Sequence, residues 1–185
     1  MKARFLVALV ALQSIWVLAT AVRQEALRWT GRIIRVETRT VDPRDLLRGD
    51  YVTLGYDMNS MPLDKIERPP APGQWKAGTP VFVELEPDGS LYRPVRGCLQ
   101  APMSVPEGHV VIAGRLGTVI EPTPGSSGNI PILYGIERFH VREGTGNPHG
   151  SLTAEIAVGR TGVPSLRELY IDNVPYAEAM RSAAR

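Results

Sequence analysis

The sequence predicts a mainly β protein, a small β-barrel or β-sandwich domain preceded by a single N-terminal transmembrane helix. Three observations predict it. An uncharged run of eighteen residues, FLVALVALQSIWVLATAV at residues 5–22, stands close to the start of the chain. After Gly31 the spacing of apolar residues changes from the helical period to alternation, the period of a half-buried strand. Alternating segments then recur between turns rich in proline and glycine, a pattern typical of all-β domains.

The apolar run predicts a membrane-spanning helix. Lys2 and Arg4 precede it and Arg23 closes it, and as an α-helix it extends about 27 Å, close to the hydrocarbon thickness of a bilayer. The positive charges on its two sides are nearly balanced, so they orient the helix only weakly. A long domain behind one early apolar segment is usually translocated. We therefore expect a single-pass inner-membrane protein with a cytoplasmic N-terminus and an extracytoplasmic, periplasmic domain.

A cleaved signal peptide is the alternative, because Ala19-Thr20-Ala21 has the small-x-small pattern of a cleavage site. Two features favour an uncleaved anchor. The helical pattern continues to Trp29, and Gly31 stands where a helix C-terminal stop falls. We therefore expect two parts: a transmembrane anchor with a helical extension over residues 1–30, and a single all-β extracytoplasmic domain over residues 31–185 with a short C-terminal helix.

Alternation and turn residues delimit the elements of the β domain. Ile34, Val36 and Thr38 alternate with charged residues and predict the first strand. The elements expected after it are a short helical turn at 42–49, a strand at 50–56, a long surface loop at 61–80, a hairpin with strands at 81–86 and 91–95, a strand at 110–116, a loop at 121–129, a strand at 132–142 interrupted by Gly135, a loop at 144–150, a hairpin with strands at 153–158 and 165–171, and a helix at 176–185.

Composition and motifs exclude several classes of function. The net charge is only +2 and is spread along the chain, so a nucleic-acid partner is not expected. Cys98 is the only cysteine, which excludes an internal disulfide and is typical of a small buried residue. The histidines, His109, His140 and His149, have no metal-ligand spacing. The sequence also lacks a phosphate-binding glycine loop, an HExxH pair and a GxSxG elbow, so we predict no catalytic residue, no metal site and no cofactor.

The segment 134–144 is unusually polar for a strand. Glu137 and Glu143 fall on one face of it, which raises the hypothesis of a general acid/base pair. On a straight strand six residues separate them by roughly 20 Å, whereas a glycosidase pair needs about 5–10 Å. We therefore expect an exposed or inter-strand salt-bridging face, with a contact surface for a partner protein as the alternative.

One short motif carries a family resemblance. Gly49, Asp50, Tyr51, Leu54 and Tyr56 match the pattern G-D-Y-x-x-L-x-Y at every specified position. The chain therefore resembles the GDYXXLXY protein family, bacterial proteins named for that motif. The surrounding sequence is similar as well, with the apolar N-terminal segment, Val41-Asp42-Pro43-Arg44-Asp45 before the motif, and a second block that contains Tyr134, Gly135, Glu137, Arg138, Glu143 and Gly144.

The resemblance covers most of residues 1–174 and implies that both blocks are structural or binding motifs. It implies no established activity, no catalytic residues and no cofactor. Members of the family are often encoded near, or joined to, multi-span membrane proteins. The implied partners are therefore the membrane and a multi-span integral membrane protein.

Two functions compete. The favoured one is a membrane-anchored extracytoplasmic β-domain that acts as a scaffold or accessory subunit of an integral membrane protein. The alternative is a small envelope-associated hydrolase or ligand-binding protein with a site around Asp50 and Glu137, with Arg138 beside them, which requires these groups to converge. The tripeptide Arg48-Gly49-Asp50 also spells an adhesion signal, but it opens a predicted strand instead of a protruding loop, so adhesion is not expected.

Overall fold

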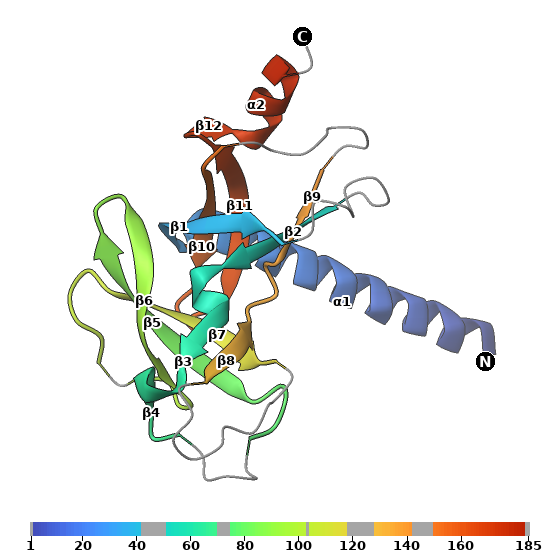
Figure 1. The fold of residues 1–185 in the computed structure, drawn as a ribbon. Coiled ribbons are helices and arrows are strands. Elements are labelled where there is room, and N and C mark those ends of the chain that lie inside the picture. The colour runs from blue at the N-terminus through green and yellow to red at the C-terminus, as the bar shows by residue number, and fades with distance from the viewer. Residues whose placement is uncertain are drawn as a thin grey trace.

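A computed structural model of the chain consists of a long N-terminal helix, α1 (Lys2–Thr30), and two curled six-stranded sheets from which it projects (Figure 1). The structure describes residues 2–41, 51–69, 75–102, 104–117, 128–141 and 150–183. The predicted fold class, mainly β with an N-terminal apolar helix, is confirmed.

The two sheets are built from strands that are distant in sequence. In order across the sheet, the first contains β12 (Val174–Pro175), β11 (Pro164–Ile171), β10 (Leu152–Val158), β1 (Arg32–Thr40), β2 (Tyr51–Tyr56) and β9 (Arg138–His140). The second contains β3 (Ser60–Pro62), β8 (Asn129–Leu133), β7 (Val110–Leu116), β5 (Pro80–Asp88), β6 (Leu91–Cys98) and β4 (Ile66–Glu67). Neighbouring strands are antiparallel except β4 and β6, which are parallel. A short helix, α2 (Tyr176–Ala183), follows β12.

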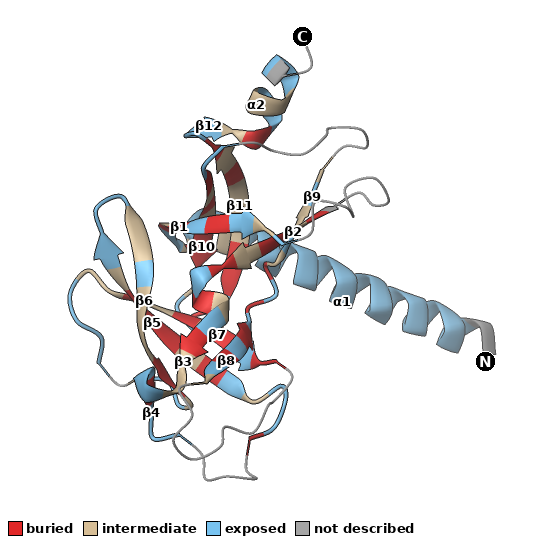
Figure 2. Cartoon of the chain, in the orientation of Figure 1, coloured by how far each residue is buried: buried red, intermediate tan, exposed pale blue. Residues whose placement is uncertain are grey.

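One hydrophobic core joins the two sheets, and strand alternation selects its residues. Ile34 and Val36 of β1 are buried while Glu37 beside them is exposed, as the sequence predicts. Val83 and Leu85 of β5 supply fully buried side chains from the second sheet. Figure 2 shows buried residues concentrated in the strands of both sheets, whereas α1 is exposed along nearly its whole described length.

The chain passes between the sheets at two neighbouring crossings. The first leads from β2 through a 3₁₀ turn, η2 (Asp57–Asn59), into β3. The second leads from β8 through residues 134–137 into β9. The predicted single strand at 132–142 was therefore wrong: β8 and β9 belong to different sheets. Gly135 lies between them with φ of +78°, a backbone conformation that residues with a Cβ rarely adopt.

The predicted surface loop at 61–80 was wrong over its first part. This segment contains the rest of β3, a 3₁₀ turn, η3 (Leu63–Lys65), and β4. Met61 pairs through its backbone with Ile130 and is buried, and Ile66 is also buried. The elements are only two or three residues long, so they carry too little alternation to be recognised from the sequence.

The last turn of α1 is fixed on β10 and β11. The N–H of Gly31 donates to the carbonyl of Leu27 at 2.9 Å, so the helix ends where the sequence predicts. A Cβ on Gly31 would lie 3.1 Å from the Cβ of Ala157, and one on Gly159 would lie 2.6 Å from Leu27. These two glycines therefore allow the helix and the sheet to approach closely.

A β-bulge in β11 provides a second attachment between the last turn of α1 and the first sheet. The register between β10 and β11 shifts after Glu155, which leaves Arg167 as the extra residue. Its carbonyl accepts a hydrogen bond from the Arg28 guanidinium at 3.2 Å, and its own guanidinium lies 5.7 Å from the centre of the Trp29 ring. The bulge thus directs one residue of β11 towards the helix end.

Candidate functional site

The structure brings part of each family block to the two crossings. Leu54 and Tyr56 end β2 with buried side chains, and Tyr134, Gly135 and Glu137 form the neighbouring crossing. The N–H of Leu54 donates to the carbonyl of Glu137 at 2.8 Å, which ties the two segments together. The backbone of Tyr51 pairs with His140, and that of Thr53 pairs with Arg138.

Several predicted positions lie outside the described residues. They are the helical turn at 42–49, the tripeptide Arg48-Gly49-Asp50, the pair Glu143 and Gly144, the greater part of the loops at 121–129 and 144–150, and the histidine His149. The convergence of Asp50 with Glu137 therefore stays a prediction.

Two buried tyrosines connect the crossings reciprocally. The hydroxyl of Tyr56 donates to the carbonyl of Ile136 at 2.9 Å, and the hydroxyl of Tyr134 donates to the carbonyl of Met58 at 2.8 Å. Each crossing therefore supplies one donor and one acceptor to the other. The family motif and the second block, eighty residues apart in sequence, form one hydrogen-bonded junction.

Burial keeps both hydroxyls protonated. It raises the pKa of Tyr56 and of Tyr134 well above the ordinary value of 10.0, and the nearby negative charge of Glu137 raises both further. A protonated phenol is the form that donates to a carbonyl. The two inter-crossing hydrogen bonds are therefore retained at every pH at which most proteins are folded.

The carboxylate of Glu137 turns back onto its own segment. It accepts the N–H groups of Tyr134 at 2.6 Å and of Gly135 at 2.8 Å, and the side-chain amide of Asn59 at 3.2 Å. Asn59 also donates to the carbonyl of Ile132 at 2.7 Å and accepts the N–H of Tyr56 at 2.7 Å. Glu137 therefore accepts hydrogen bonds from N–H groups that have no strand partner where the chain leaves the sheet. Its position in the sequence does not predict these hydrogen bonds.

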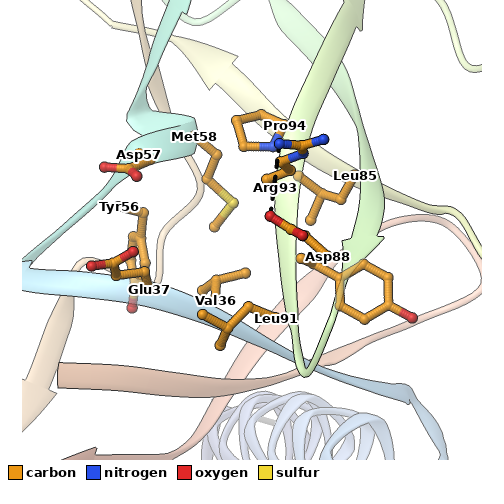
Figure 3. Close-up of a pocket in the computed structure, with 11 residues that line it drawn as sticks. Val36, Glu37, Tyr56, Asp57, Met58, Leu85, Asp88, Leu91, Arg93 and Pro94 are labelled. Atoms are coloured by element: carbon orange, nitrogen blue, oxygen red, sulfur yellow. Dashed lines mark ion pairs between the residues drawn. The ribbon is translucent and has the colours of Figure 1, made fainter. Parts of the chain in front are cut away.

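A cavity smaller than a usual small-molecule pocket adjoins the junction. Figure 3 shows it between β1, η2 and the β5–β6 hairpin, with Tyr56, Met58 and Leu85 around it. Its charged residues lie on its rim, where Arg93 pairs with Asp88 at 3.7 Å. Its volume is about 80 Å³, whereas pockets for small molecules usually measure about 300–1,000 Å³. On this side, the junction therefore leaves less room than a small-molecule ligand usually occupies.

Two larger grooves lie on either side of the β10–β11 turn, the turn that Leu27 of α1 contacts. The first, of about 720 Å³, is apolar: Leu133 and Val163 are exposed on it, Tyr134 and Gly135 reach it from the second block, and Arg115 is its one charged residue among those described. The second, of about 460 Å³, has cationic and histidine side chains on its wall.

The second groove contains a histidine whose role the sequence does not indicate. The Nδ1 atom of His109 lies 2.6 Å from a carboxylate oxygen of Glu84, and the other oxygen accepts the Nε–H of Arg96 at 2.5 Å. Glu84 is only 4% exposed. His109 and Glu84 are 25 residues apart, and neither stands in a recognisable motif, so no local signal could have joined them.

Two further features concern the predicted chemistry. The thiol of Cys98 is buried, as expected, and burial raises its pKa, with a hydrogen bond to Glu67 adding to the effect. Within the described ranges no three histidine, cysteine or carboxylate side chains converge as metal ligands would.

Fold and junction together define a class of protein: one apolar helix precedes a β domain, and two hydrogen-bonded crossings join the two sheets of that domain. The chain belongs to the GDYXXLXY protein family, whose model matches residues 13–169. Comparison with curated proteins and with solved structures found no match. The predicted family is thus confirmed.

Proposed function

We propose that the protein is a membrane-anchored, extracytoplasmic accessory subunit, or scaffold, of an integral membrane protein. The observation that carries the proposal is the uninterrupted course of α1 from its apolar segment into its attachment on β10 and β11. A helix fixed in this way holds the β domain at a defined position relative to whatever surrounds the apolar segment.

The exposure of α1 supports an anchor. Residues 4–26 are exposed on every side of the helix, including large apolar side chains such as Phe5 and Trp16, at 73% each. Among the described residues, Arg4–Thr30 is the one helix long and apolar enough to cross a bilayer. Apolar side chains exposed all round a helix are stabilised by lipid, not by water. The helix also continues through Ala19-Thr20-Ala21, the segment that fits a cleavage site.

The face of α1 that is continuous with its domain contact carries polar groups. Gln13, Thr20 and Leu27 are seven residues apart, close to two helical turns, so they lie on one face. The Thr20 hydroxyl donates to the carbonyl of Val17 at 2.8 Å, whereas among the described residues no hydrogen bond reaches the Gln13 amide. In hydrocarbon such an amide gains from a hydrogen bond to another helix. Because Leu27 contacts the β domain, that partner helix lies on the domain's side of α1.

The apolar groove supports a second contact outside the bilayer. Leu133 and Val163, exposed at 53% and 43%, border it beside the turn that contacts Leu27. Exposed apolar side chains at the border of a groove can pack against a partner protein. A partner in contact with Gln13 and with this groove is held on one side of the helix.

Site-specific photocrosslinking in native membranes tests the partner. A photoreactive residue at Gln13 or Leu133 is expected to capture an integral membrane protein. One at Ile15, two residues from Gln13 and on the opposite face of the helix, serves as the control and is expected not to. Recovery of the uncrosslinked monomer alone from all three positions would contradict the accessory role. Recovery of a crosslinked dimer of this chain would show self-association instead.

The anchor and its orientation are tested separately. The full chain is expected to stay in the membrane fraction after alkaline extraction, and its release would contradict an anchor. A Thr161→Cys variant is expected to react with a membrane-impermeant thiol reagent added to the extracytoplasmic side, since Thr161 is exposed and Cys98 is buried. Labelling only after the reagent is given access to the cytoplasmic side would show that the β domain faces the cytoplasm.

A further inference from the structure

The groove beside His109 combines an apolar floor with a cationic wall. It lies between β7, the β10–β11 turn and the junction of α1 with β1. Its apolar lining includes Val105, Val110 and Val111, and its polar lining consists of Thr30, Arg32, His109, Arg160 and Thr161. Among the described lining residues there is no aspartate or glutamate. The groove therefore differs from the cavity in Figure 3, whose rim carries three carboxylates.

His109 is held in one orientation from two sides. One carboxylate oxygen of the buried Glu84 accepts a hydrogen bond from Nδ1–H of His109, and the other accepts from the Arg96 guanidinium. The backbone of His109 is held as well: the Arg32 guanidinium donates to its carbonyl at 3.0 Å and to that of Gly108 at 2.8 Å. Within the described part of the chain the other ring nitrogen, Nε2, has no hydrogen-bond partner.

The positive charges of the wall are not neutralised locally. Among the described residues neither Arg32 nor Arg160 lies within ion-pair distance of a carboxylate. On the outer side of the first sheet, by contrast, Arg35 and Arg167 share the carboxylate of Glu155. A cationic wall above an apolar floor matches a ligand with an anionic head and an apolar tail.

The position of the groove adds a source for such a ligand. Thr30 lies on the groove and is seven residues beyond Arg23, which closes the apolar run. Seven helical residues span about 10 Å, slightly more than the roughly 5–8 Å of the polar headgroup region on one side of a bilayer. With α1 in a membrane, the groove therefore lies at the outer edge of the headgroups.

We propose that this groove binds a small anionic amphiphile, with its phosphate or carboxylate head on His109 and Arg160 and its apolar tail on Val105, Val110 and Val111. Glu84 is a positioning residue: it orients the His109 ring and does not itself contact the ligand. The inference concerns a ligand site of the β domain and does not depend on the membrane-protein partner.

Isothermal titration calorimetry of the full chain in decyl maltoside micelles tests the site with hexyl phosphate as the probe. Hexyl phosphate is expected to bind at least about tenfold more tightly than inorganic phosphate, because only the former reaches the apolar floor. Hexyltrimethylammonium, with the same tail and the opposite charge, is expected not to bind. Equal affinity for hexyl phosphate and inorganic phosphate, or binding of the cation, would overturn the proposal.

Three variants locate the binding. Arg160→Ala and His109→Gln are each expected to weaken hexyl phosphate binding about tenfold, the loss of one charge-assisted hydrogen bond. Val105→Asp is expected to weaken it at least as much. Arg160 and Val105 are exposed, so these two variants test the site without depending on a buried side chain.

Arg115→Ala is the matched control, since it removes the same charge from an exposed arginine on the apolar groove. It is expected to leave binding unchanged. An equal loss in Arg115→Ala and Arg160→Ala would show a response to net charge alone and would overturn the site.

Vesicles distinguish the source of the ligand. The full chain is reconstituted in phosphatidylcholine with and without phosphatidic acid, and hexyl phosphate binding is measured again. If phosphatidic acid competes with hexyl phosphate, and if Arg160→Ala abolishes that competition, the site is supported and its ligand comes from the bilayer. Undiminished hexyl phosphate binding in both vesicles supports the site and assigns its ligand to the aqueous phase. No binding in either vesicle overturns it.

Discussion

The junction between the sheets and the groove at the base of α1 are each organised by one glutamate, but the partners of the two carboxylates differ in kind. Glu137 accepts from backbone N–H groups and from Asn59, all within the junction. Glu84 accepts from Arg96 and His109, two long side chains that are 36% and 21% exposed. A carboxylate that satisfies backbone groups stabilises the chain's path. One that orients a histidine beside a groove can also prepare a binding surface.

The largest effect on stability is expected at Glu137. Glu137→Ala removes the acceptor of the part-buried Tyr134 N–H and of the more exposed Gly135 N–H, and we expect it to lower the free energy of unfolding by about 3 kcal/mol. Glu37→Ala, an exposed glutamate on β1, is expected to change it by less than about 0.5 kcal/mol. Urea titration of the full chain in micelles, followed by near-ultraviolet circular dichroism, measures both. Equal losses would show that the junction does not depend on this carboxylate.

Each of the two tyrosine hydroxyls is expected to contribute less to stability than the Glu137 carboxylate does, and their contributions are expected to be coupled. Tyr56→Phe and Tyr134→Phe each leave one buried carbonyl without its donor, at a cost of about 1–2 kcal/mol. Because both hydrogen bonds join the same two crossings, the double variant is expected to deviate from additivity by at least about 0.5 kcal/mol. Strict additivity would mean that the crossings are held independently.

Alkaline pH tests the same tyrosines without mutation. Their pKa values are raised in the folded chain, so the folded state binds protons more tightly than the unfolded state above pH 10. The stabilisation is fully present below pH 10 and is lost as the pH rises above it, by about 1.4 kcal/mol per pH unit for each tyrosine. Urea midpoints measured between neutral pH and pH 12 are expected to fall less steeply in each phenylalanine variant. Parallel curves would contradict the shifted pKa values.

A substitution at Glu84 is expected to lower stability less than the Glu137 substitution does, and to affect ligand binding more. In Glu84→Gln both former partners reach water, so the free energy of unfolding is expected to fall by only about 1 kcal/mol. Hexyl phosphate binding is expected to weaken about tenfold, because the amide keeps one acceptor oxygen for two donors and so holds the His109 ring less firmly. Glu137→Gln is the comparison: it is expected to lower stability and leave binding unchanged. The reverse pattern would exchange the roles assigned to the two carboxylates.

Most strands could be predicted from the sequence because their alternation coincides with burial. This holds for β1, for the β5–β6 and β10–β11 hairpins, and for β7. The break between β8 and β9 could not be predicted, because alternation continues through it. Ile130, Ile132, Tyr134 and Ile136 are all buried although the chain leaves one sheet and enters the other. Gly135 was the one local signal of that break.

The contacts of the candidate sites were less predictable than the strands. The family motif indicated that Tyr56 and Glu137 matter, but not that they meet through Asn59. His109 gave no signal, because its orientation depends on Glu84 in a different strand. Local patterns report burial and turns, whereas these sites arise from pairs brought together only by the topology of the sheets.

The attachment of α1 has a mechanical consequence. Gly31 joins the helix directly to β1, and Leu27 and Arg28 fix its last turn on β10 and β11, so there is no flexible tether between them. In a bilayer, a transmembrane helix tilts to match the local hydrocarbon thickness. With α1 anchored in a bilayer as proposed, the rigid joint would make the helix a lever: a change in bilayer thickness or in a neighbouring helix would swing the whole β domain over the membrane surface.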